Sequence, residues 1–498
     1  MTAPGQTPPA RTREQNQNAV AEGDDKVFGA GAEQPAGGIQ GAEQPAGGVP
    51  HAEGPPALQT AQMLLRPVSF VERCRRRYGD TFGAHFLPAG EVVMISDPDS
   101  LKRLFGADRV NTIAPGRNFA LEPLVGPRSV LLLTGAEHMR RRKLMLPPSH
   151  GERMRAYEAV IAEATEREVA SWPLGAGFRL HARMQAITLD VILGAVFGIG
   201  GARRDELRRR LVAILAATRS PASIGITMRR LRWLPRFRRI RRLQAETDEL
   251  LATEIASRRV DPDLADREDI LSMLLAARFD DGAEIPVRGL SPETGVSGRR
   301  RRPQGMGDAE IRDQLITLLV AGHETTATAL AWSFELLFRS PAAMERAREA
   351  AASGEQAYID AVAKETLRVR PVVPFTGRML LESAELGGYV LPAETVILAS
   401  IWLAHTRAAT FPDPYAFVPE RFLDGSPETY SWIPFGGGTR RCLGAAFAQL
   451  EMGVVLREVL RRAVLAPASD RPETIVRRNV TLAPRHGTPA ILRERVAA

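Results

Sequence analysis

The sequence predicts a mainly α-helical protein: a single large helical domain with a small β-sheet region, preceded by a disordered N-terminal tail. Apolar residues recur at helical spacing through most of the chain from Ala57 onward. Strand-like stretches are few and short. The first 56 residues hold 10 glycines and 8 prolines and contain GAEQPAGG twice, a low-complexity composition that cannot bury a core.

The helical periodicity is clearest in seven segments: 153–171, 203–218, 239–258, 308–339, 342–351, 356–370 and 443–464. Alternation indicates strands at Glu91–Ile95, Tyr389–Leu391 and Thr395–Ala399, and we expect the last two to pair as a small antiparallel sheet. Residues 1–56 are expected to form the tail and 57–498 the domain. Within the domain, residues 282–307 have no periodicity and predict an exposed loop insertion.

Composition excludes several classes of protein. The 498 residues are 44% hydrophobic and 25% charged, which is ordinary for a globular protein. Cys74 and Cys442 are the only cysteines, so a disulfide framework and a multi-cysteine zinc site are excluded. No signal-peptide pattern is visible, and the apolar stretch Leu315–Leu337 contains His323 and Glu324, which favours a buried core helix over a membrane span. We expect a soluble, cytoplasmic protein.

Cys442 lies where a glycine-rich stretch, FGGGTRRCLG, meets an amphipathic helix. The positive end of that helix, its free N–H groups, Arg440 and Arg441 all favour a thiolate. A lone cysteine is usually a small buried hydrophobe. The glycines favour a functional thiol, because they let the backbone approach something bulky and flat.

The stretch around Cys442 reproduces the F-x-x-G-x-R-x-C-x-G signature of the cytochrome P450 superfamily, with Phe435, Gly438, Arg440, Cys442 and Gly444 at its fixed positions. The sequence resembles the soluble bacterial members over about residues 57–498. The resemblance implies that Cys442 is the proximal thiolate ligand of haem b (iron protoporphyrin IX), that Arg440 pairs with a haem propionate, and that Phe435 and Gly444 also belong to the cofactor site. A thiolate ligand favours O–O cleavage at the iron.

Upstream, the predicted helix 308–339 carries AGHETT at Ala321–Thr326. A glycine and threonines in a helix usually serve packing, but their order before the cysteine motif matches the family. The resemblance implies that Thr325 and Glu324 are catalytic and that they supply protons to bound dioxygen. His323 occupies the variable position of the motif and is expected to pack or to meet solvent.

KETLR places Glu365 and Arg368 one helical turn apart, and VPERF supplies Arg421. Such a pair in isolation is most often an exposed ion pair of little energetic worth. The resemblance implies instead a buried structural triad that fixes the cysteine loop.

GAEHMRRRK puts His138 and Arg142 on one helix face, where the resemblance implies contacts with the haem propionates. By itself the motif could be a solvated basic face. Arg378 matches a third propionate-binding position.

The sequence departs from the family at LPAET, where Glu394 stands at a position that is usually glycine, and at the insertion 282–307.

Met228–Arg242 contains eight arginines with two aromatic residues. A solvated helix start is the favoured interpretation, and contact with a membrane surface or an acidic substrate is the alternative.

The resemblance places apolar segments around the substrate: Phe119–Val125, Ile224–Met228, Leu318–Ala321, Val372–Phe375 and Thr481–Leu482.

The function implied is a haem-thiolate monooxygenase that hydroxylates or epoxidises an apolar small molecule with dioxygen. No flavin- or iron–sulfur-binding region is appended, so the expected electron donor is a separate ferredoxin or flavodoxin with its reductase. Basic residues such as Arg441 suit an acidic donor. The alternatives are a peroxide-using or rearranging haem-thiolate enzyme and, outside enzymes, a haem sensor or basic binding module. Nucleic-acid binding is not expected.

Overall fold

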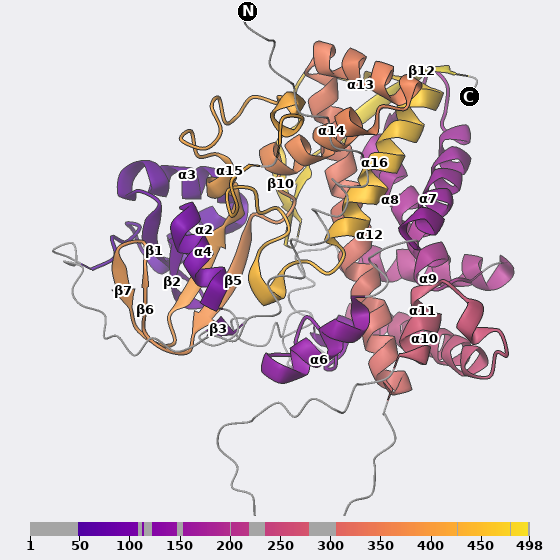
Figure 1. Ribbon diagram of the computed structural model, residues 1–498, viewed down its shortest axis with the longest axis horizontal. Helices are drawn as coiled ribbons and strands as arrows, with labels where there is room; N and C mark the ends of the chain where they lie inside the picture. The colour runs from indigo at the N-terminus through magenta and orange to yellow at the C-terminus, as the bar shows by residue number, and fades with distance from the viewer. Residues whose placement is uncertain are drawn as a thin grey trace, which may run out of the picture. The chain divides into compact units, whose positions relative to one another are not determined.

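Helix α12 (Asp308–Phe338) is the central element of the helical region (Figure 1). The computed structural model describes residues 48–107, 112–113, 122–146, 153–199, 201–218, 235–277, 305–425, 427–478 and 480–496. From Thr326 to Leu337 every side chain of α12 is buried, because this half of the helix has neighbours on all sides. A helix that is apolar all round is expected to be buried in this way.

The larger apolar core surrounds the second half of α12. It includes the fully buried Phe334, Trp172 and Tyr358. The helices that contribute to it are α7 (Arg153–Ala170), α8 (Leu180–Ala195), α13 (Pro341–Ser353), α14 (Gln356–Val369) and α16 (Ala445–Arg462).

A second apolar cluster lies at the first half of α12. It joins residues such as Leu193, Leu271 and Leu315. The helices around it are α6 (Gly135–Met145), α9 (Gly201–Thr218), α10 (Pro235–Arg259) and α11 (Ile270–Ala276). Short helical segments complete the chain: α5 (Glu122–Val125), η5 (Leu264–Asp266), α15 (Ile401–His405), η6 (Pro419–Phe422) and η7 (Gly438–Arg440).

The largest sheet has five strands in the order β1-β2-β8-β5-β3. Its strands are β1 (Thr81–Phe86), β2 (Gly90–Ile95), β3 (Thr112–Ile113), β5 (Phe375–Leu380) and β8 (Val396–Ser400). Only the β2–β8 pair is parallel. Helices α2 (Pro56–Leu65), α3 (Pro67–Tyr78) and α4 (Pro98–Gly106) lie beside this sheet (Figure 1).

Three smaller sheets complete the β structure that the described residues form. Strands β6 (Ala384–Leu386) and β7 (Tyr389–Leu391) make one hairpin, and β10 (Ile475–Arg478) and β11 (Thr481–Pro484) make another. A three-stranded sheet has the order β4-β12-β9, from β4 (Gly177–Arg179), β9 (Ala463–Pro467) and β12 (Pro489–Arg495).

The predicted mainly helical fold with small sheets is confirmed. The seven predicted helices are present with ends shifted by up to four residues. The pairing of Tyr389–Leu391 with Thr395–Ala399 was wrong. Strand β7 pairs with β6 through a turn in which Gly387 and Gly388 have φ of 62° and 81°, while β8 lies between β2 and β5.

The packed part of the chain begins before the boundary expected at residue 57. His51 forms a bridge with Gly83 of β1, and the N–H of Ala52 donates to the Gly83 carbonyl at 2.8 Å. These residues therefore add to the sheet region. Residues 1–47 of the expected tail and 282–304 of the expected insertion lie outside the described residues.

No described helix is long and apolar enough to cross a membrane. The stretch Leu315–Leu337 belongs to α12, where Glu335 is buried and forms an ion pair with Arg339 at 2.9 Å. Residues 228–234 of the basic stretch lie outside the described residues, and residues 235–242 start α10.

Candidate active site

Cys442 lies in a closed loop directly before α16. Its N–H donates to the carbonyl of Phe435 at 2.9 Å, which closes the loop from the aromatic residue to the cysteine. Gly436 and Gly438 have φ of 71° and 65°, a region that only glycine adopts without strain. The Cβ of any side chain at position 437 would lie 2.4 Å from the Phe105 ring. The glycines therefore serve the loop's own turn and its contact with α4.

The thiol of Cys442 remains accessible, but protein surrounds it closely enough to change its acidity. Desolvation raises the pKa of Cys442, whereas the N–H of Gly444 and the nearby Arg142 and Arg441 lower it. The helix start and Arg441 act on the thiol in the expected direction, and desolvation by the surrounding protein opposes them. A metal ion deprotonates a coordinating thiol outright, so the donor suits a metal ligand.

His138, Arg142, Arg378 and Arg440 converge from separate segments on this loop. Burial is the largest of the causes that lower the pKa of His138 to about 3, and the charges of Arg440, Arg142 and Arg378 contribute to the same shift. Burial likewise lowers the pKa of Arg142, which lies close enough to Cys442 and Arg441 to interact with both. No carboxylate among the described residues forms an ion pair with Arg142. The cluster is therefore strongly positive around the thiol.

Two of these arginines connect the cysteine loop to other segments. Arg378 is buried, and its Nη2 donates to the carbonyl of Gly437 at 2.9 Å while its guanidinium lies 5.3 Å from the centre of the Phe105 ring. Arg440 donates to the carbonyls of Val130 and Leu133. Both arginines thus help to set the position of the cysteine loop.

Glu365, Arg368 and Arg421 lie together behind the loop. Glu365 and Arg368 are fully buried, and Glu365 Oε1 also accepts from the N–H of Val418 at 3.0 Å. Arg421 lies farther away, with 3.5 Å between its Nε and Glu365 Oε1, and that buried Nε has no hydrogen-bond partner. The Glu365–Arg368 ion pair is therefore the stronger interaction of the three residues, and Arg421 adds a weaker contact.

Thr325 and Glu324 lie near the middle of α12. The Thr325 hydroxyl donates to the Ala321 carbonyl at 2.6 Å, and the Glu324 carboxylate accepts from Gln185 Nε2 at 2.6 Å. His323 is buried, and its Nδ1 lies 2.9 Å from the Thr188 hydroxyl. In the described part of the chain, no group of three or more metal-binding side chains is found.

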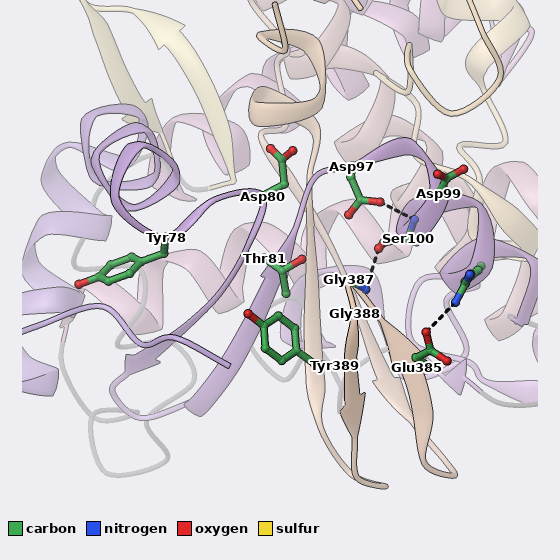
Figure 2. A pocket seen from close by; sticks show the side chains of 11 residues that line it. Tyr78, Asp80, Thr81, Asp97, Asp99, Ser100, Glu385, Gly387, Gly388 and Tyr389 are labelled. Carbon is green, nitrogen blue, oxygen red and sulfur yellow. Dashed lines mark hydrogen bonds and ion pairs between the residues drawn. The ribbon is translucent and has the colours of Figure 1, made fainter. Parts of the chain in front are cut away.

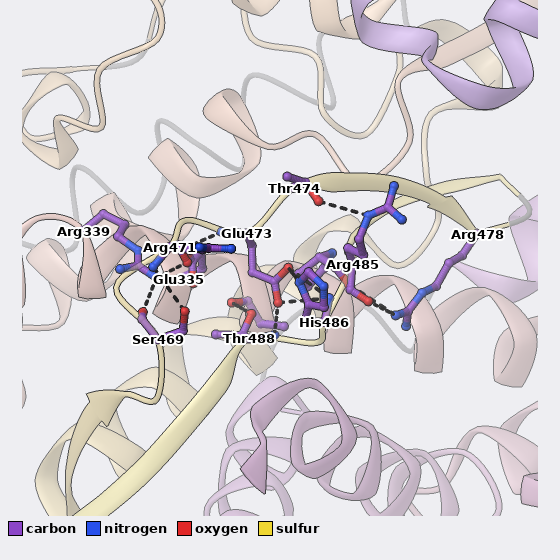
Figure 3. A network of polar contacts seen from close by, with 12 residues as sticks. Glu335, Arg339, Ser469, Arg471, Glu473, Thr474, Arg478, Arg485, His486 and Thr488 are labelled. Carbon is purple, nitrogen blue, oxygen red and sulfur yellow. Dashed lines mark hydrogen bonds and ion pairs between the residues drawn. The ribbon is translucent and has the colours of Figure 1, made fainter. Parts of the chain in front are cut away.

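Three of the segments expected around the substrate, those that contain Val372, Leu482 and part of α12, lie next to one another in the fold or adjoin the same helix. The N–H of Leu482 donates to the Val372 carbonyl at 2.7 Å, and the carbonyl of Leu482 accepts from Trp332 of α12 at 2.9 Å. Glu473 supports the hairpin that carries Leu482, because its carboxylate accepts from the N–H groups of His486 and Thr488 (Figure 3). Residues 119–121 and 224–228 lie outside the described residues.

A separate open hollow of about 380 Å³ lies between α4 and the β6–β7 hairpin (Figure 2). Its polar groups are used to join these elements: Asp97 accepts from the N–H of Ser100 at 2.8 Å, and the Ser100 hydroxyl accepts from the N–H of Gly387 at 2.9 Å. None of the predicted site residues lines it.

Comparison of the chain with models of known protein families agrees with these features of the site. The family model described as Cytochrome P450 matches residues 50–489. The chain belongs to the cytochrome P450 family. Members of this family are haem-thiolate monooxygenases, and the protein is accordingly an oxidoreductase of that class.

Named relatives come from mycobacteria. The chain is 40% identical over 437 residues to the Mycobacterium tuberculosis protein named cytochrome P450 135B1, which covers 86% of this chain and 88% of the relative. It is 37% identical over 423 residues to cytochrome P450 137 of the same organism, covering 84% of this chain and 83% of that one.

Solved cytochrome P450 structures share the fold. The cyanobacterial CYP120A1 with retinoic acid bound has a TM-score of 0.75 and 23% identity, and covers 91% of this chain and 100% of its own. The haem domain of cytochrome P450DA has a TM-score of 0.74 and 20% identity, with 91% and 99% covered.

Sequence reasoning missed several buried polar residues of the site. Gln185 and His181 of α8 contact Glu324, and Glu451 of α16 is hydrogen-bonded to Thr326. His405 accepts the N–H of Ile433 at 2.8 Å, ahead of the cysteine loop. The sequence signal for α8 was available, because His181, Gln185 and Thr188 recur at the spacing of one helix face.

Proposed function

We propose that this chain binds haem b through the thiolate of Cys442 and oxidises an apolar organic substrate with dioxygen. The observation that carries the proposal is the convergence of His138, Arg142, Arg378 and Arg440 around an accessible thiol. A cationic cluster suits the two carboxylates of haem b, and the thiol suits its iron. The residues present therefore fit the group.

The haem would supply the iron at which dioxygen is reduced and cleaved. Cys442 would donate electron density from its sulfur, and the N–H of Gly444 would moderate that charge. Phe435 closes the loop through its carbonyl and packs at 6.2 Å from the Trp432 ring, which fixes the sulfur's position. His138, Arg142, Arg378 and Arg440 would bind the propionates.

Glu324 and Thr325 are proposed to deliver protons. The Thr325 hydroxyl can exchange its bond to the Ala321 carbonyl for one to a bound molecule, because a hydroxyl hydrogen can rotate toward another acceptor. The Glu324 side chain is 22% exposed, so its carboxylate can take up a proton from solvent and pass it inward.

The substrate is proposed to be an apolar small molecule that is hydroxylated or epoxidised. The apolar residues Val372 and Leu482 adjoin α12, the helix that carries Thr325. An apolar lining favours an apolar substrate.

Electrons are proposed to come from a separate ferredoxin or flavodoxin with its reductase, in the cytoplasm. Arg441 is exposed beside Cys442, which suits an acidic donor surface. A peroxide-using or rearranging enzyme is the alternative within the family. The pair Glu324 and Thr325 favours the monooxygenase, since proton delivery to dioxygen is what an acid and a hydroxyl at this place would serve.

Thr325→Ala tests this assignment. We expect reductase-driven product formation per oxygen consumed to fall about tenfold, with more hydrogen peroxide released, because a proton donor is lost. Thr253→Ala is the matched control, since exposed Thr253 makes the same hydroxyl-to-carbonyl bond, to Glu249 at 2.9 Å. Unchanged coupled turnover in Thr325→Ala would favour the peroxide-using or rearranging enzyme.

A further inference from the structure

Helix α8 presents a stripe of three polar side chains to α12. His181, Gln185 and Thr188 occur at positions i, i+4 and i+7, which lie on one helix face. Thr188 donates to the His323 carbonyl at 3.2 Å and also contacts the His323 ring. The stripe therefore follows α12 along the turn that carries Glu324.

Gln185 holds the Glu324 carboxylate directly. The distance from Gln185 Nε2 to Glu324 Oε2 is 2.6 Å. The amide nitrogen can only donate, so the carboxylate oxygen must accept. A hydrogen bond to a carboxylate is stronger than one between neutral groups, so this contact can fix the orientation of the Glu324 side chain.

His181 approaches the same carboxylate from the next turn. Its side chain is 3% exposed, and its Nε2 lies 3.2 Å from the Thr328 hydroxyl and 3.8 Å from Glu324 Oε1. Arg478 Nη1 lies 3.1 Å from His181 Nδ1. A guanidinium has no acceptor, so Nδ1 must accept, and the proton of the neutral ring is on Nε2, on the side of Glu324.

Arg478 is itself fixed by the β10–β11 hairpin. Its Nη2 donates to the carbonyls of Pro484 and Arg485 at 3.2 and 3.3 Å (Figure 3). The hairpin therefore sets the tautomer of His181, and α8 sets the orientation of Glu324. His181 and, behind it, Arg478 are the titratable and charged groups that α8 and the hairpin bring toward this side of Glu324.

We propose that Gln185 and His181 are positioning residues that orient the Glu324 carboxylate, and so set its ability to pass protons to Thr325. The inference rests on the proposed role of Glu324. It adds to that role two residues of a different helix, and it links proton supply to the hairpin that carries Thr481 and Leu482.

Two substitutions of Gln185 test the proposal in the holoenzyme. Gln185→Met removes the donor while keeping the length of the side chain, and we expect product per oxygen consumed to fall about tenfold at every pH. Gln185→Glu puts a second carboxyl against Glu324. The two should share a proton at low pH, which restores a donor, and repel each other at higher pH. Its coupling should therefore approach that of the unsubstituted enzyme only at low pH.

Arg183→Met is the matched control on α8, since Arg183 pairs with Glu168 at 3.2 Å. A loss of coupling with the same pH dependence in Gln185→Met and Gln185→Glu would overturn the proposal. So would full coupling in both variants.

A double-mutant cycle tests the contact without any turnover. The melting temperature of the holoprotein is measured for Gln185→Met, Glu324→Met and the double variant. We expect the effect of Gln185→Met to be about 2 °C larger when Glu324 is present. Additive effects would contradict the contact. If the unsubstituted enzyme consumes no oxygen with substrate, the proposed function fails, and the cycle still decides whether Gln185 holds Glu324.

Discussion

Arg368 binds the Glu365 carboxylate through two hydrogen bonds, Nε to Oε2 and Nη2 to Oε1, each 2.7 Å long. Neither side chain has exposed surface. The remaining Arg368 donors reach the carbonyls of His405, Pro414 and Ala416. One ion pair therefore joins α14 to the chain segments that lead to the cysteine loop.

Glu365→Ala is expected to abolish haem incorporation. It leaves the Arg368 charge buried without its carboxylate, which costs about 3–5 kcal/mol of the free energy of unfolding. Haem content of the purified protein, from absorbance per mole of chain, measures the effect. Glu355→Ala is the control, because Glu355 forms an ion pair with Arg346 in which the two side chains are 40% and 38% exposed. A normal haem content in Glu365→Ala would refute the role of the pair.

Glu394→Gly is expected to stabilise the protein. Glu394 has a φ of 65°, which explains why glycine is usual at this turn in the family. In this φ region a residue other than glycine destabilises the folded state by about 1–2 kcal/mol. Glycine instead lowers stability by about 0.5–1 kcal/mol, because it makes the unfolded chain more flexible. The free energy of unfolding should therefore rise by at most about 1.5 kcal/mol in chemical denaturation. Glu382→Gly is the control, because exposed Glu382 lies outside this φ region and its substitution should lower the stability. A lower free energy of unfolding in both variants would contradict the explanation.

Glu451 is expected to make stability fall as the pH rises. Burial raises the pKa of Glu451 to about 8 from an ordinary value of 4.5, although a hydrogen bond from Thr326 lowers it in part. Between these values the folded protein keeps a proton that the unfolded chain releases. The free energy of unfolding therefore falls by about 1.4 kcal/mol per pH unit from this group.

Glu451→Gln removes this dependence. Its free energy of unfolding, relative to the unsubstituted protein, should rise steadily from pH 5 to pH 8 in denaturant titrations. Parallel pH profiles for the two proteins would show that Glu451 does not keep its proton on folding.

The long helices could be predicted from sequence because their apolar spacing is a local property. Strand pairing could not, since β8 lies between β2 and β5, which are distant in the chain. The sequence shows Tyr389–Leu391 and Thr395–Ala399 as neighbours, but only long-range contacts decide that β7 turns back onto β6.

For the site, the cysteine loop and the Glu365–Arg368 pair could be named because their residues recur at fixed spacing. The acidity of Cys442 could not, because desolvation depends on every element packed around the thiol. Arg142 acts on the thiol although it is 300 residues away in the chain, and this depends on how α6 packs. The contact of Gln185 with Glu324 likewise needs the packing of α8 on α12.

The absorption spectrum of the reduced protein with carbon monoxide tests the central claim most directly, compared between the unsubstituted protein and Cys442→Ser. We expect the unsubstituted protein to give the spectrum of a thiolate-bound haem and Cys442→Ser to lose it, because the hydroxyl of serine is a poor substitute for a thiolate ligand. A haem protein without a thiolate-type spectrum, or a spectrum unchanged in Cys442→Ser, would contradict the assignment of Cys442 as the ligand.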